Sequence, residues 1–168
     1  MKRILLAIAL IAITADSTHA DSQAVLAGTH WRLVEFQSMS DEVATRVPHD
    51  SSLYLMQLNA DGSVTMQLDC NRAAGSWAAR ASDNPANGRF EFGPIAATRM
   101  LCPPPSMDEF VIAQAQYVRG YLLKDSRLYL SLMADGGIFV WEAVPGKASP
   151  TAVPASPEDG GTHKVPVS

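Results

Sequence analysis

The fold of this chain is decided by residues 68–75, LDCNRAAG, read together with residues 98–102, TRMLC. The two segments hold its two cysteines, Cys70 and Cys102, and neither has a second Cys or a His beside it at metal-ligand spacing. A structural zinc site usually takes four such ligands. Outside residues 1–20 and 145–168, only His30 and His49 could serve as zinc ligands beside the two thiols. We therefore expect no metal and no other cofactor.

The N-terminus indicates export. Residues 1–3 form a basic start, residues 4–13 are uninterruptedly apolar, and Thr18-His19-Ala20 supplies a small-x-small cleavage site. The apolar run is shorter than the roughly 20 residues that span a bilayer, and no cysteine follows it as a lipid attachment site. We predict a signal peptide over 1–20 and a mature protein that is periplasmic or secreted, without a stable membrane anchor.

Export decides the state of the two thiols. A pair of buried free thiols would be the expectation in the cytosol, whereas cysteines in an oxidising compartment usually pair. We therefore predict a disulfide between Cys70 and Cys102.

Charge and composition limit the partners. Without residues 1–20 the chain keeps 11 basic and 16 acidic residues, a net charge of −5. Nucleic-acid-binding domains usually show a basic patch, so nucleic acid is not an expected partner. Residues 145–168 contain no aromatic residue and a proline every few positions, which is typical of disordered segments. We predict one folded domain over 27–144, monomeric, followed by a disordered tail over 145–168.

The folded part is predicted to be mostly β. Short apolar or alternating segments bounded by turn residues indicate strands; they cover 31–36, 53–58, 63–68, 76–79, 89–92, 121–123, 128–132 and 138–143. Residues 59–62 are expected to close a hairpin. Asn71 and Gly75 are expected to reverse the chain after Cys70, and Gly93-Pro94 to end the strand over 89–92.

One helix is predicted after the second cysteine. Ser106 and Glu109 have capping-box spacing, so Ser106 is expected as the N-cap. Phe110, Ala113 and Tyr117 are expected to face the sheet, and Gly120 is expected to close the helix.

These features together resemble the META domain, the family that includes the bacterial heat-shock protein HslJ. The resemblance rests on Trp31-x-Leu33, the turn at Asp61-Gly62, Cys70-Asn71-x-x-x-Gly75, Thr98-x-Met100-x-Cys102 and Glu109, followed by a closing hairpin that ends at Trp141. It implies a small α+β domain in which an antiparallel, barrel-like sheet of about seven to eight strands packs on one helix. It also implies the paired cysteines and associations with envelope stress, motility and virulence. Asp69 and Leu101 stand where the family commonly has Gly and Ala.

Catalytic motifs are not found in the sequence. Neither His30 nor His49 has a nucleophile motif beside it, and no glycine-rich phosphate loop is present. Carboxylate pairs such as Asp41-Glu42 and Asp108-Glu109 are expected in a loop and at a helix start. We therefore expect a protein that is not an enzyme.

Two functions remain open at this point. In the first, the domain is an envelope module that binds a protein, with stress or envelope integrity as its setting. Asn71, Arg72 and Arg99 are then the candidate binding surface, because the disulfide would hold their loops rigid. In the second, the barrel carries an apolar ligand such as a lipid tail. Five bulky residues are expected to fill so small an interior and thus favour the first; they are Met56, Met66, Phe90, Phe92 and Tyr117.

Overall fold

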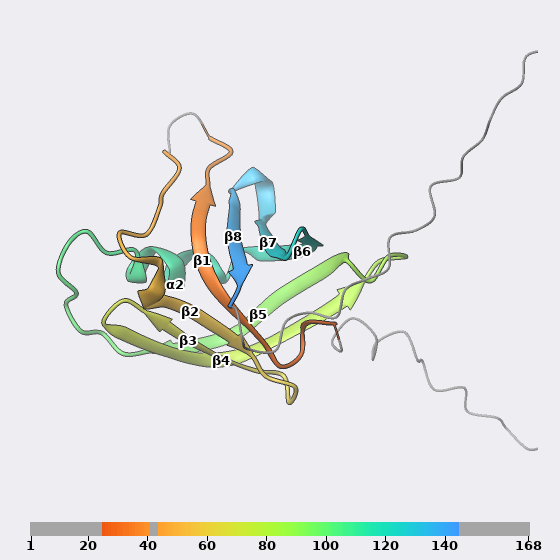
Figure 1. Cartoon of the computed structure of the whole chain (residues 1–168), viewed down its shortest axis with the longest axis horizontal. Helices are drawn as coiled ribbons and strands as arrows, with labels where there is room; N and C mark the ends of the chain where they lie inside the picture. Colours follow the sequence, from red (N-terminus) through yellow and green to blue (C-terminus); the bar gives the residue numbers. More distant parts are fainter. Residues whose placement is uncertain (1–24, 41–43, 145–168) are drawn as a thin grey trace, which may run out of the picture.

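A computed structural model describes residues 25–40 and 44–144 as a closed barrel of eight antiparallel strands in sequence order (Figure 1). The strands are β1 (Thr29–Gln37), β2 (Tyr54–Leu58), β3 (Ser63–Leu68), β4 (Asn71–Ala81), β5 (Asn87–Ala97), β6 (Val118–Lys124), β7 (Arg127–Leu132) and β8 (Ile138–Ala143). Helix α2 (Asp108–Ala115) connects β5 to β6, and β8 pairs with β1 to close the ring. The predicted α+β barrel is confirmed. The predicted signal peptide and tail lie outside the described residues, within which no helix is long and apolar enough to cross a membrane.

The hairpin of β2 and β3 forms as the alternation predicts. Val64, Met66 and Leu68 are buried, and Thr65 between them is exposed. Met66 lies opposite Met56 of β2. The turn is fixed by Asp61, whose carboxylate accepts hydrogen bonds from the backbone N–H and the hydroxyl of Ser63, at 2.9 and 2.7 Å.

The chain reversal near Cys70 differs from the prediction. The turn consists of Asp69 and Cys70, and Asn71 already pairs with Leu68 as the first residue of β4. Asp69 takes the left-handed conformation with φ of 57°, which Asp reaches more easily than most residues. Gly75 lies within β4 and takes no part in the chain reversal. A Cβ there would lie 2.6 Å from the carbonyl oxygen of Pro94, so glycine is needed for the close approach of β5.

Strand β5 does not end at Gly93-Pro94 as predicted but continues to Ala97. The β4–β5 ladder has a bulge between Gly75 and Trp77, and this bulge accommodates Gly93 and Pro94 within the strand. Bulges are one of the few places where a sheet tolerates proline. With 11 residues each, β4 and β5 form the long green hairpin of Figure 1.

Helix α2 begins and ends elsewhere than predicted. Its N-cap is Met107, and within the described part of the chain no side chain makes a capping hydrogen bond there. The Ser106 hydroxyl instead donates to the Asp108 carboxylate at 2.8 Å, so the capping box does not form. Gly120 pairs with Arg89 and Ser131 inside β6 and ends no helix.

The buried apolar residues of α2 are Val111 and Ala115, and Asp108 in its first turn is buried as well. Val111 and Ala115 lie one helical turn apart and therefore share a face. The prediction placed Ala113 and Tyr117 there, but both are exposed, Tyr117 by 42%. Phe110 is half-buried and contacts Phe36 edge to face, with ring centroids 4.8 Å apart.

Large side chains fill the barrel. Trp31, Trp77 and Trp141 are buried, as are Met56, Met66 and Phe90. Phe92 packs partly buried against this core, whereas Tyr117, the fifth residue predicted inside, does not contribute. The interior is thus a packed core of the kind expected for a small eight-stranded barrel.

Candidate functional site

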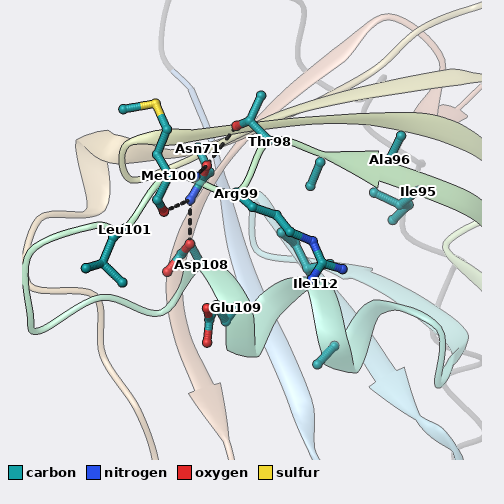
Figure 2. Close-up of a pocket in the computed structure, with 12 residues that line it drawn as sticks. Asn71, Ile95, Ala96, Thr98, Arg99, Met100, Leu101, Asp108, Glu109 and Ile112 are labelled. Carbon is teal, nitrogen blue, oxygen red and sulfur yellow. Dashed lines mark hydrogen bonds between the residues drawn. The ribbon is translucent and has the colours of Figure 1, made fainter.

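A groove lies between the end of β5 and helix α2 (Figure 2). Its volume is about 680 Å³, within the usual range for ligand sites. One wall is a continuous run of seven residues, Ile95 to Leu101, and the other is formed by Asp108, Glu109, Ile112 and Ala113 of α2, with Asn71 at the end. The groove therefore joins the two cysteine segments to the helix.

Asn71 connects these walls. Its side-chain amide nitrogen donates to the Met100 carbonyl at 2.9 Å and to the Asp108 carboxylate at 2.7 Å. Its side-chain oxygen accepts from the Thr98 hydroxyl at 2.7 Å and from the Met100 N–H at 2.8 Å. The residue is only 1% exposed. Because both backbone groups of Met100 bind one buried side chain, the segment after β5 is held in a fixed position.

Asp108 is the charged member of this network and is 7% exposed. Burial on its own raises the pKa of a carboxyl group, but here hydrogen bonds from Ser106, Asn71 and the backbone N–H of Glu109 outweigh it. The pKa of Asp108 therefore lies below its ordinary value. The group stays ionised at neutral pH as a structural anion at the start of α2.

The lowered pKa of Asp108 predicts a pH-dependent stability. A carboxyl group whose pKa is lower in the folded state stabilises the fold above its unfolded pKa of about 3.9, and this contribution is lost as the pH falls through the folded value. Asp108→Asn should thus be less stable than the wild type at pH 6–7, and the difference should shrink below about pH 4. Urea denaturation between pH 7 and 2.5 measures it. The control Glu109→Gln, at an exposed site, should change the unfolding free energy by less than about 0.5 kcal/mol; an Asp108→Asn difference that is constant with pH would contradict the assignment.

The predicted disulfide is confirmed. Cys70 and Cys102 are bonded, with their Cα atoms 5.6 Å apart. The bond joins the turn before β4 to the chain that leads into α2. Together with Asn71 it fixes residues 98–102 at both ends.

The three residues predicted as a binding surface lie in three different environments. Arg99 is exposed and lines the groove, and its side chain extends from the end of β5 in the direction of α2 (Figure 2). Asn71 is buried under the groove, so the prediction that it is presented on the surface is wrong in that respect. Arg72 is exposed, but it lines a separate hollow with His30 and Met56. Of these three residues, only Arg99 therefore offers a charge in the groove, which the carboxylates of Asp108 and Glu109 also line.

The sequence prediction missed the two most exposed apolar residues beside Arg99. Leu101 is 98% exposed and Met100 is 61% exposed. Both lie in the segment fixed by Asn71 and the disulfide. Exposed apolar side chains on a fixed backbone are typical of protein contact sites. The sequence signal for them was the apolar pair directly before Cys102.

Other polar groups lie away from the groove. His30 is half-buried, and its Nδ1 has no hydrogen-bond partner among the residues that the structure describes; His49 is exposed. Arg80, Arg89 and Arg119 line a second hollow, of about 630 Å³, together with Glu91. Across residues 25–40 and 44–144, no three His, Cys, Asp or Glu side chains are grouped as metal ligands.

Comparisons with known proteins agree with this fold. A protein from Burkholderia xenovorans, determined by NMR, superposes with a TM-score of 0.60 at 17% identity, over 84% of this chain and 99% of the other. The crystal structure of a DUF4847 family protein from Bacteroides vulgatus gives a TM-score of 0.50 at 14% identity, over 70% and 93% of the two chains. Identities this low show a shared fold alone. No curated protein matches the sequence. The family profile of the META domain matches residues 24–143, and the chain therefore belongs to the META domain family.

Proposed function

We propose that this domain is an exported, non-catalytic module that binds another protein of the cell envelope through the groove between β5 and α2. The observation that carries the proposal is the exposure of Leu101, Met100 and Arg99 on backbone that Asn71 and the disulfide hold in place. Stress response or envelope integrity is the setting that the resemblance suggested.

Fixed backbone favours binding for a thermodynamic reason. A loop that must become ordered on association loses conformational entropy, and this loss weakens the complex. Here Met100 is hydrogen-bonded to Asn71 through its N–H and its carbonyl, and Cys102 is tied to Cys70. The contact residues between these anchors thus lose little freedom on binding. An apolar anchor flanked by a charge is the usual composition of an interaction hot spot and its rim.

The packing of the barrel favours this surface over an interior ligand site. Trp31, Trp141 and Met56 occupy positions inside the ring and are buried, so an apolar ligand would have to displace core side chains. The groove needs no such rearrangement. The same proposal places the protein in the periplasm or outside the cell, supported by the disulfide, which is typical of oxidising compartments.

Charge and side-chain changes in the groove should weaken partner capture. The immobilised, disulfide-bonded protein is incubated with an envelope extract, and bound proteins are quantified by mass spectrometry. Arg99→Glu and Leu101→Asp should each reduce recovery of the specific partner by about tenfold or more, because each removes a central contact. Arg72→Glu is the matched control, since Arg72 is also exposed but lies outside the groove, and should bind like the wild type.

Two outcomes would count against the proposal. Equal capture by all four proteins would remove the groove as the binding surface. An apolar molecule retained by the wild type in native mass spectrometry, and lost in Met56→Glu or Met66→Glu variants that still fold, would replace it with the carrier function.

A further inference from the structure

We infer that the groove takes an extended segment of the partner protein, which adds as a strand to the free edge of β5 and lies between β5 and α2. This inference rests on the proposed function and specifies the form and chemistry of the partner. Four observations carry it.

The first observation is that β5 has a free edge. Its ladder with β6 covers only Asn87 to Arg89, whereas β5 itself continues to Ala97. On the other side its pairing with β4 extends to Ala97. No strand among the described residues pairs with the β6-facing edge beyond Arg89, so the closed ring has a long unpaired stretch at this point.

The second observation is the direction of the backbone groups on that stretch. The Thr98 N–H donates to the Arg72 carbonyl at 2.9 Å, so Thr98 directs its hydrogen-bonding groups toward β4. These groups alternate along an antiparallel strand. Ala96 therefore also faces β4, opposite Ala74, while Ala97 and Ile95 direct their N–H and carbonyl groups outward into the groove.

The third observation is that consecutive residues line the space. Side chains of a strand alternate between its two faces, so a hollow over one face is lined by every second residue. The groove instead touches all seven residues from Ile95 to Leu101. A neighbouring hollow of about 420 Å³ touches Phe92 to Ile95, and the two share Ile95 and Ile112. The space therefore follows the edge of β5, with α2 as the opposite wall.

The fourth observation is Pro94. Proline has no N–H to donate, so within a sheet it is confined to edges, first residues and bulges. Pro94 lies in the middle of β5 within the bulge, between Phe92, which pairs with Trp77, and Ile95, which pairs with Gly75. An added strand can therefore pair without interruption along Ile95 to Ala97 and along the segment that continues to Leu101. Pro94 marks the end of this usable edge.

The side chains around this edge define the occupant. Ile95 and Ile112 are partly buried apolar residues on the two walls, and Leu101 extends the apolar surface. Arg99 is exposed and takes part in no ion pair found among the described residues, while the carboxylates of Asp108 and Glu109 belong to the opposite wall of the groove. The occupant is therefore an extended segment of about five residues with small or apolar side chains and a carboxylate that faces Arg99. Strand addition of this kind takes affinity from main-chain hydrogen bonds and specificity from alternate side chains.

The test uses random nine-residue linear peptides displayed on phage, selected against the intact, disulfide-bonded protein. Selected peptides are synthesised and added to the isotope-labelled protein, and amide hydrogen exchange is followed by NMR. We expect the Ile95 and Ala97 amides to exchange at least about tenfold more slowly, because they gain a partner. The Ala96 and Thr98 amides already face β4 and should change little. Selected sequences should share an Asp or Glu, and Arg99→Glu should weaken their binding.

Methylation of single peptide nitrogens supplies a second readout that leaves the protein unchanged. Nitrogens that face β5 should each lose about tenfold in affinity when methylated, since one hydrogen bond is worth about that factor. The nitrogens between them should tolerate it, which gives a period of two along the peptide. Ala97→Pro removes one outward N–H of the protein and should weaken binding likewise, and the methylated series decides the matter where this variant does not fold.

The failures of the two proposals can be told apart. Strand addition is overturned if no peptide is selected, or if bound peptides slow no β5 amide and tolerate methylation at every nitrogen. In those cases binding of a folded partner at the groove still stands if Arg99→Glu and Leu101→Asp reduce capture from the envelope extract. If these two variants also capture normally, both proposals fall.

Discussion

Replacing Asn71 with alanine is expected to lower the free energy of unfolding by about 3–5 kcal/mol. The side chain is 1% exposed and makes hydrogen bonds to Thr98, Met100 and Asp108. A bond to a charged group contributes about 1.5–3 kcal/mol and a neutral one about 0.5–1.5 kcal/mol. The loss is large because the variant also leaves the buried Asp108 carboxylate without its amide donor.

Chemical denaturation of oxidised protein measures this loss. Asn84→Ala is the control, since Asn84 is exposed and accepts one turn hydrogen bond from the Ala86 N–H; it should cost no more than about 1.5 kcal/mol. Asn71→Asp should be as damaging as alanine at neutral pH, because it places a second carboxylate beside Asp108, and should recover in acid as one of the pair is protonated. A cost below about 1 kcal/mol for Asn71→Ala would show that the network contributes little.

Removing the disulfide is the other change with a large expected effect. Cys102→Ser opens a loop between residues 32 positions apart, which the chain-entropy estimate values at about 3.5–4 kcal/mol. For a domain of this size the melting temperature should fall by roughly 10 °C or more. The variant should also weaken partner capture, because the bond fixes one end of the segment that carries Leu101.

Scanning calorimetry of three samples separates the bond from the substitution. Cys102→Ser, the double variant with Cys70→Ser, and wild type reduced with dithiothreitol should melt within a few degrees of one another. A fall of less than about 3 °C in all three would mean that the fold does not depend on the bond. A low melting temperature in the serine variants but not in the reduced wild type would assign the effect to the replaced cysteine side chains rather than to the bond.

Strands with strict alternation, such as β3, were predicted correctly, and so was β8, which lacks that alternation. In β3, Val64, Met66 and Leu68 lie on one face of a half-buried strand, and such a pattern depends on the local chain alone. The errors arose where tertiary contacts override local preference. Gly93-Pro94 has turn composition, but a bulge and the pairing with β4 keep it within β5.

The site was less predictable because it is built from residues far apart in sequence. Asn71 was expected to stabilise its own turn, yet its partner Asp108 lies 37 positions away. Ser106 has the spacing of an N-cap residue, yet its hydroxyl is hydrogen-bonded to the Tyr54 hydroxyl and the Asp108 carboxylate instead. The edge of β5 was invisible from sequence, since it depends on where β6 stops pairing. Arg99 was found because it lies within the cysteine segment 98–102, which forms part of one wall of the groove.

The central claim, that the groove between β5 and α2 is the binding surface, is tested most directly by site-specific crosslinking. A photoreactive benzoylphenylalanine replaces Leu101 in one variant and Lys124 in another; both sites are exposed, and Lys124 ends β6 outside the groove. Both variants are irradiated in cells that produce the protein. We predict a discrete higher-mass adduct from position 101, absent from position 124 and lost when Arg99→Glu is added. Equal labelling at both positions, or an adduct at 124 alone, would contradict the claim.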